Sequence, residues 1–290
     1  MYALLAALLA AAFLIPYKAA GTLGSRSAIV AAMLLCAAVL NTMTGVAKRG
    51  GKPIASRVSL LTIAGLGVLT VTGNIGMAAA LSYQEPAVTA VLLQVQIFLV
   101  AGIEWAVLRE RITGRFAVGA AIALGGFALM QLGSGGMSAH AIGVAWAMVA
   151  ALSFACMHVL TRAVIHRIDA VWVNAFRLWL ASAVLLSWPG TASAAAALSL
   201  EAWLLCAAAA LLGPMLSRLC LMWSVRYIPA SRATLVAMAG PLFALALGLA
   251  AFGVIPTARE LGGGALILVG VAIPLVAMTS RAAARSGTGP

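Results

Sequence analysis

Long runs of Ala, Leu, Val and Gly fill most of the chain, and short groups of polar residues, Pro or Gly separate them. A helix that crosses the hydrocarbon core of a membrane takes about 20 mostly apolar residues, whereas membrane β-barrels show alternating segments of about ten residues. Because the runs are long and do not alternate, they predict an all-α integral membrane protein. We expect ten spanning helices, near residues 2–19, 27–47, 58–82, 86–107, 114–132, 138–162, 169–189, 200–225, 229–252 and 259–280.

The amino-acid composition agrees with this pattern. Hydrophobic residues make up 64% of the 290 residues and charged residues only 8%, while soluble domains carry about 25% charged residues. The first run has no Lys or Arg before it, although a secretory signal begins with a basic region. We therefore interpret residues 2–19 as a permanent span.

Two stretches that lie 144 residues apart share an unusual number of residues. Seven of the sixteen positions in Thr113–Ala128 are identical to those in Thr257–Ala272. The most informative matches are Arg115 with Arg259, Gly119 with Gly263, and Gly126 with Gly270. Such self-similarity predicts an internal duplication. We expect one five-helix repeat at 1–133, a second at 138–281, and a short cytoplasmic tail at 282–290.

The positions of the basic residues predict the orientation. With the N-terminus inside, thirteen of the eighteen Lys and Arg residues fall on the cytoplasmic side, three fall outside and two lie within spans. This asymmetry follows the positive-inside rule, so we expect both termini in the cytoplasm. The net charge of +12 then reflects topology and does not predict a nucleic-acid partner. Because five spans separate equivalent positions, the second repeat is expected to be inverted, a common plan of secondary transporters.

Local motifs add a family resemblance to this plan. They are Tyr83-Gln84-Glu85-Pro86 and Tyr227-Ile228-Pro229 before the fourth and ninth segments, Pro241-Leu242-Phe243 within the ninth, and Glu104 near the end of the fourth. In these motifs and in its five-plus-five inverted plan, the whole chain resembles the drug/metabolite transporter (DMT) superfamily, in particular its EamA-type members. Two features depart from the pattern. Gln96-Ile97-Phe98 replaces the first-half Pro, and Leu249 and its neighbours supply no acid in the ninth segment.

Within the superfamily, the chain is most similar in length and character to the YddG-type exporters of aromatic and other neutral amino acids. This resemblance implies a transporter of the bacterial inner membrane that exports amino acids from the cytoplasm by alternating access. The first three segments contain no acidic residue, which favours a uniporter-like mechanism over proton coupling and argues against lipophilic cations as substrates. The alternative is a DMT carrier of another small metabolite or drug, such as a nucleotide-sugar or phosphate-like anion or a lipophilic compound.

Two arginines fall inside predicted spans, where a charge is costly and indicates a binding site or a water-filled cavity. Arg177 and Arg218 have no acidic residue predicted nearby. A substrate carboxylate is therefore a candidate counter-charge, through bidentate contact with a guanidinium. The alternative is that each side chain extends along its aliphatic stem to the cytoplasmic interface.

Other polar and aromatic residues in the spans complete the set of candidate substrate-binding residues. They are His158, Asn41, Asn74, Gln94, Gln96, Trp146, Trp179 and Trp223. The histidine is a candidate proton shuttle, the amides are candidates to line a cavity for a zwitterion, and the indoles are candidates to contact an aromatic substrate. Each type also has a purely structural role, in hydrogen bonds between helices or, for Trp, at the membrane interface.

The remaining motifs predict scaffolding and no catalysis. The matched glycines permit close helix approach, so we expect the fifth and tenth segments to be scaffold, and Pro214 and Pro241 to kink their helices. The four cysteines lack C-x-x-C spacing, and we find no Ser-His pair with an orienting acid, no H-E-x-x-H and no paired aspartates. We expect no enzyme, metal or cofactor. The expected partners are a small-molecule substrate and the lipid bilayer; both a monomer and a homodimer are compatible with the sequence.

Overall fold

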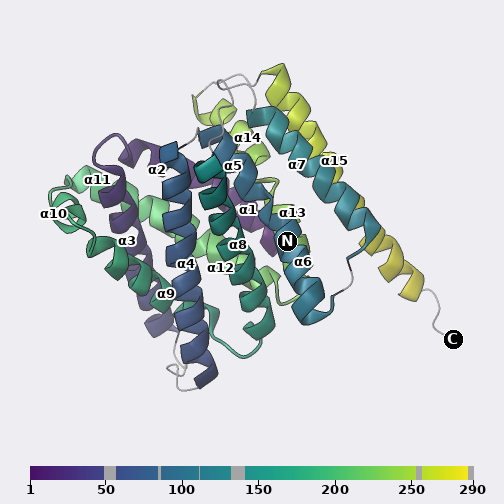
Figure 1. Cartoon of the computed structure of the whole chain (residues 1–290), viewed down its shortest axis with the longest axis horizontal. Helices are drawn as coiled ribbons and strands as arrows, with labels where there is room; N and C mark the ends of the chain where they lie inside the picture. The colour runs from purple at the N-terminus through teal and green to yellow at the C-terminus, as the bar shows by residue number, and fades with distance from the viewer. Residues whose placement is uncertain (49–56, 84–85, 111, 132–140, 253–256, 287–290) are drawn as a thin grey trace.

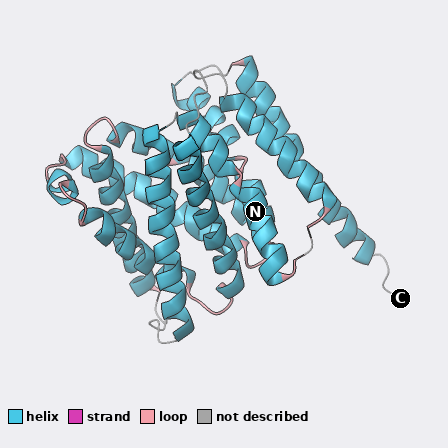
Figure 2. Cartoon of the chain, viewed as in Figure 1, coloured by secondary structure: helices cyan, strands magenta, loops and turns pink. Residues whose placement is uncertain are grey.

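Helices joined by short loops make up the residues that the computed structural model describes, which are all except 49–56, 84–85, 111, 132–140, 253–256 and 287–290 (Figure 2). This confirms the predicted all-α class. The elements are α1 (Tyr2–Ala12), α2 (Leu14–Ala20), α3 (Arg26–Ala47), α4 (Arg57–Tyr83), α5 (Pro86–Gln94), α6 (Gln96–Leu108), α7 (Gly114–Gln131), α8 (Ala141–Val164), α9 (Ala170–Leu186), α10 (Thr191–Ala196), α11 (Leu200–Ala210), the π-helix η1 (Leu211–Ser217), α12 (Arg218–Ser224), α13 (Ala230–Ala237), α14 (Gly240–Phe252) and α15 (Ala258–Ser286).

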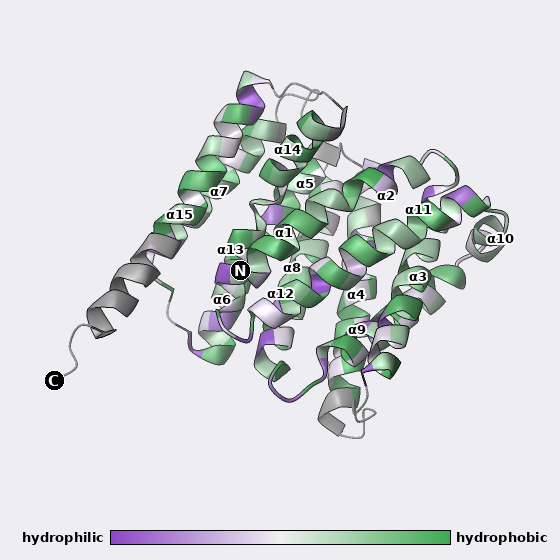
Figure 3. Cartoon of the chain, turned by 180° about the vertical axis from the view of Figure 1, so that it is seen from behind, coloured by the Kyte–Doolittle hydropathy of each residue, from purple (hydrophilic) through white to green (hydrophobic). Residues whose placement is uncertain are grey.

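Many of these helices have the length and composition of membrane spans. In the described part of the chain, seven stretches are long and apolar enough to cross a membrane, and α7 and α9 supply shorter apolar helices. Most residues along the described helices are hydrophobic, and hydrophilic residues lie mainly near helix ends (Figure 3). Each of the ten predicted segments is mainly helical over its described part, whereas the number of crossings and their direction stay predictions.

Several of the predicted segments are divided into two helices. The fourth is interrupted at Val95 and the ninth at Met238 and Ala239. Val95 and Ala239 are 144 residues apart and therefore equivalent in the repeat. In both interruptions the backbone tightens to three-residue turns, with Val95 N–H bonded to Leu92 O and Ala239 N–H to Val236 O, each at 3.1 Å. Pro241 accounts for the second break, but the first occurs without a proline.

The segment that contains Pro214 is deformed in another way. Residues Leu211–Ser217 form one π-helical stretch between α11 and α12. Proline has no N–H to donate, so a carbonyl in the preceding turn loses its partner, and wider π turns accommodate this. The predicted kink at Pro214 thus takes the form of a π-helix that opens part of the backbone to side chains of neighbouring helices.

The repeated helices α7 and α15 pack against each other at one edge of the molecule (Figure 1). A Cβ atom added to Gly119 would lie 2.4 Å from Gly270 O, and one added to Gly126 would lie 2.5 Å from Gly263 O. The two backbones therefore approach as closely as they do because these positions lack side chains. This arrangement fits the expected scaffold role, because each helix of the pair packs against the other.

One end of the bundle, which we call the Glu104 end, gathers the last turns of α6, α8 and α12 and the first turn of α13. Glu104 is 1% exposed and accepts hydrogen bonds from Ala230 N–H and, at 2.9 Å, from Ser231 N–H. The carboxylate therefore caps the N-terminus of α13 from the other repeat. Sequence reasoning placed Glu104 near a span end and did not anticipate that it is buried between helices.

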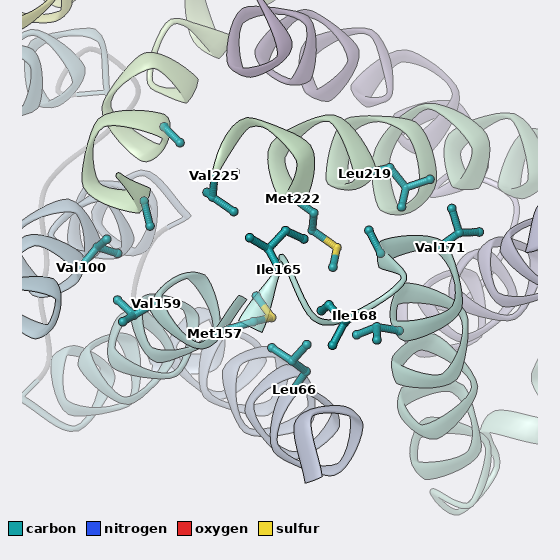
Figure 4. Close-up of a cluster of buried hydrophobic side chains, with 14 of the residues drawn as sticks. Leu66, Val100, Met157, Val159, Ile165, Ile168, Val171, Leu219, Met222 and Val225 are labelled. Carbon is teal, nitrogen blue, oxygen red and sulfur yellow. The ribbon is translucent and has the colours of Figure 1, made fainter. Parts of the chain in front are cut away.

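Further contacts hold the Glu104 end together. Arg162 donates a hydrogen bond to Val225 O and lies 3.6 Å from the Glu110 carboxylate. A buried apolar cluster fills the space between α4, α6, α8, α9, α12 and α13 (Figure 4). It includes Leu66, Met157, Ile165, Ile168, Leu219, Met222 and Val225. These contacts join the helices of both repeats at this end of the bundle.

Candidate functional site

Arg177 lies at the centre of a network of neutral hydrogen-bonding groups. It is 6% exposed. Its Nη2 donates to Asn174 Oδ1 at 2.7 Å, one turn earlier on α9, and its Nη1 donates to Thr70 Oγ1 of α4 at 3.1 Å. The same Nη1 lies 3.6 Å from Met157 Sδ of α8. The guanidinium thus joins α9 to helices of both repeats and is buried within the bundle.

Asn174 extends this network to two more elements. Its Nδ2 donates to Asn41 Oδ1 of α3 at 3.1 Å and to Pro214 O of η1 at 3.0 Å. Asn41 in turn donates to Ala37 O at 2.7 Å, and both asparagines are fully buried. A buried amide needs such partners, because an unpaired polar group in an apolar interior is costly. We call Asn41, Thr70, Asn174 and Arg177 the central polar network.

Arg218 and His158 form a second polar group beside this network. His158 Nδ1 lies 2.6 Å from Phe154 O, and Arg218 Nη1 lies 3.4 Å from His158 Nε2. Since a carbonyl only accepts, Nδ1 carries the proton, and Nε2 is left to accept from the guanidinium. His158 is therefore neutral in this arrangement. Met157 and His158 are adjacent on α8, so this helix brings the two arginines into one region.

The Arg218 guanidinium has spare donor capacity and faces a cavity. Its Nε has no hydrogen-bond partner among the described residues. The cavity has a volume of about 10 Å³ and is lined by His158, Thr161, Arg218, Leu221, Met222 and Val225. A second cavity of about 10 Å³ is lined by Leu34, Thr70, Val71, Asn74, Ile75, Ala181 and Leu185. Each cavity combines a few polar groups with an apolar wall and has room for about one water molecule.

The carboxylates of the described chain lie away from both arginines. Glu104 caps α13, Glu110 contacts Arg162, and Asp169 accepts from Val171 N–H at 2.8 Å at the start of α9. Glu260 bonds to Thr257 and Glu201 lies in the first turn of α11, and both belong to helix starts. Within the described residues, the two guanidinium groups therefore sit among neutral partners with no acidic counter-charge.

The structure brings only some of the predicted residues together. Asn41 and Arg177 meet in the central polar network, and Asn74 joins it through its hydrogen bond to Thr70 O at 2.7 Å. His158 and Arg218 meet in the neighbouring group. Thr70 and Asn174 were not singled out from the sequence. The available signal was the three-residue spacing between Asn174 and Arg177, which places both on one face of a helix.

The other predicted residues lie elsewhere. Gln94 and Gln96 flank the break at Val95, and Gln96 Oε1 is buried without a hydrogen-bond partner in the described part of the chain. Trp146 and Trp179 are exposed, and Trp179 Nε1 donates to Thr42 Oγ1 at 3.0 Å. Trp223 lies at the Glu104 end against Tyr2 and Lys48. These positions suit Trp residues at a bundle surface.

Comparisons with known proteins identify the kind of chain that carries this arrangement. The model of the EamA-like transporter family matches residues 1–132 and again residues 141–276. A solved structure described only as "Crystal structure of protein" covers 95% of this chain and 95% of its own, with a TM-score of 0.76 and 19% identity. At that identity the likeness concerns the fold alone. No curated protein matches the chain.

Proposed function

Because the chain belongs to the EamA-like transporter family of the DMT superfamily, and is therefore a multi-pass membrane protein, we propose that it exports amino acids from the cytoplasm. Aromatic and other neutral amino acids are the substrates that we propose, in the inner membrane of a bacterium and with both termini in the cytoplasm. The Glu104 end is then the cytoplasmic end. The two repeats move against each other, so that a central site opens alternately to the two sides of the membrane, as in other transporters built from inverted repeats.

The observation that carries this proposal is the pair of guanidinium groups among neutral partners. A buried cation without a counter-charge is expensive. The carboxylate of an amino acid supplies that charge and accepts charge-assisted hydrogen bonds from a guanidinium. Arg218 is the better-placed donor, because its Nε has no partner among the described residues and its side chain lines a cavity. Arg177 is already engaged with Asn174 and Thr70, and it lies 3.6 Å from Met157, the residue before His158 on α8.

The wall of the cavity favours an apolar side chain on the substrate. Leu221, Met222 and Val225 line it beside His158 and Arg218. A neutral amino acid has a carboxylate at one end and an apolar group at the other, and it matches both kinds of surface. Asn174 and Asn41 offer the amide oxygens and N–H groups that a zwitterion needs nearby, once the network opens.

A phosphate-bearing anion is a second candidate, and the presence of two arginines favours it. A phosphate group carries more negative charge than one carboxylate, and guanidinium groups bind it with the same bidentate geometry. Nucleotide sugars and sugar phosphates belong to this class. The two candidate substrates differ in the number of arginines that they need: an amino-acid carboxylate needs one of Arg177 and Arg218, and a phosphate group needs both.

Counterflow into proteoliposomes tests the proposal. Vesicles loaded with unlabelled compound would take up labelled amino acids, dipeptides, lipophilic cations or sugar phosphates, with and without a pH gradient. We expect exchange of neutral amino acids that needs no gradient, and a loss of at least about tenfold in Arg218→Gln. Arg226→Gln is the control, since Arg226 also has an unpaired Nε but follows α12. Exchange of sugar phosphates alone would overturn the proposal.

A further inference from the structure

The duplication places an amide and a guanidinium at the same position of the two repeats. The offset of 144 residues pairs Asn74 of α4 with Arg218 of α12, and Thr70 with Pro214 one turn earlier in each helix. Thr70 and Pro214 both accept hydrogen bonds within the central polar network, Thr70 from Arg177 and Pro214 from Asn174. Asn74 and Arg218 are therefore equivalent in sequence and each lies one turn from that network.

The two residues line different cavities on opposite sides of the network. The Arg218 cavity runs along α12 to Val225, whose carbonyl is bound by Arg162 at the Glu104 end. The Asn74 cavity starts at Thr70 and continues to Ile75. Leu66, one turn before Thr70, belongs to the apolar cluster of the Glu104 end. The Asn74 cavity thus extends toward the other end of the bundle.

We propose that Arg218 and Asn74 are two unequal stations for the substrate carboxylate, one reached from each side of the membrane. This inference rests on the proposed function and adds to it a difference in affinity between the two faces. Hydrogen bonds from a charged donor to a carboxylate are roughly twice as strong as neutral ones. The transporter therefore binds substrate more tightly from the Glu104 end than from the opposite end.

The difference in affinity between the two faces does not change the equilibrium distribution of substrate across the membrane. A carrier that is not coupled to an energy source cannot accumulate substrate, so Vmax/KM is equal in the two directions when the solutions match. A low KM at the Glu104 face is then accompanied by a low Vmax from that face. The signature of unequal stations is a pair of KM values that differ while their Vmax/KM ratios agree.

Initial rates measured from each face test this inference. The assay uses proteoliposomes in which the protein has one verified orientation, with an amino acid that the wild type exchanges. We expect the KM at the Glu104 face to be at least about tenfold lower than at the opposite face. Arg218→Asn, which makes the two stations alike, should bring the ratio of the two KM values close to one. Asn74→Arg combined with Arg218→Asn should reverse it.

Two further variants serve as controls. Arg226→Asn removes a nearby guanidinium outside both cavities and should leave the ratio unchanged, whereas Arg218→Lys keeps a charge at the station and should retain most of the asymmetry. Equal KM values at the two faces of the wild type would overturn the inference and leave the proposed function standing. A ratio that survives Arg218→Asn would overturn it as well. If no carboxylate is transported from either face, the proposed function fails together with the inference.

Discussion

The helix pair α7 and α15 and the helix pair α4 and α11–η1–α12 are both products of the duplication, but they have diverged to different extents. Gly119 contacts Gly270, and Gly263 contacts Gly126. Because Gly263 and Gly270 are the repeat equivalents of Gly119 and Gly126, this is one contact present twice, as a two-fold relation between the halves requires. In the other pair, Thr70 and Asn74 have equivalents of different chemistry, Pro214 and Arg218.

This difference indicates what each pair contributes. Where two backbones touch, a side chain of any size would separate them, so the same small residue occurs in both halves. Around the central polar network, by contrast, the two halves supply different groups to a shared interior. The comparison predicts that changes in α7 or α15 act on stability, while changes at the centre act on transport.

The largest expected effect is that of a methyl group at the helix crossing. In Gly126→Ala the new Cβ would lie 2.5 Å from Gly263 O and 2.7 Å from Leu266 Cβ, and such overpacking costs about 1–3 kcal/mol. Gly125→Ala is the matched control, since its Cβ would meet nothing within 4 Å. Thermal unfolding in detergent should show a lower Tm for the first variant and no loss for the second. Equal Tm values would contradict the scaffold role.

A replacement at the centre should separate stability from transport. In Arg177→Met the hydrogen bonds to Asn174 and Thr70 are lost, but a buried charge without an acidic partner is removed as well, and these effects oppose each other. We expect a change in the free energy of unfolding within about 1 kcal/mol. Counterflow of an amino acid should fall at least about tenfold, because α4, α8 and α9 lose the guanidinium that contacts all three.

Arg177→Lys refines this test. Lysine keeps the charge but cannot reach Thr70 and Asn174 with two fixed donors, so its transport should be reduced nearly as much as that of Arg177→Met. Wild-type transport in both variants would show that the central polar network has no part in the transport cycle.

The smallest expected effect is that of replacing Glu104, whose capping role is not repeated in the second half. Glu104 caps α13, whereas its repeat equivalent in the sequence is Gly248, which has no side chain to cap a helix. Glu104→Gln keeps a carbonyl acceptor but removes the charge beside the helix N-terminus, which should cost about 1 kcal/mol in the free energy of unfolding. Glu110→Gln, at a half-exposed residue 3.6 Å from Arg162, should have almost no effect. If thermal unfolding shifts equally in both variants, the cap is not what stabilises this end.

The sequence predicted the parts of this molecule that depend on local pattern. Hydropathy located the helical segments, and the matched glycines at 119, 126, 263 and 270 indicated close packing. The break at Val95 was not predicted, because no proline or other local signal marks it. Its equivalence with Ala239 suggests that packing in the duplicated architecture imposes the break.

The partners of buried polar residues depend on tertiary packing and were harder to predict. Arg177 was identified as an unusual charge within a span, but its partners were not. Thr70 lies on a different helix, and hydrophobic periodicity does not mark Asn174 on the same helix as a partner. Glu104 illustrates the same limit, because its partners begin a helix in the other repeat. Trp146 and Trp179 are exposed, since an indole in a span carries no signal of which way it faces.

The most direct test of the proposed recognition is to compare each transported amino acid with its carboxamide in counterflow by the wild-type protein. The carboxamide keeps the ammonium and side chain but has no negative charge for a guanidinium to bind. We expect exchange of the carboxamide to be at least about tenfold slower. Equal exchange of the acid and the carboxamide would contradict recognition of the substrate through Arg218 and Arg177.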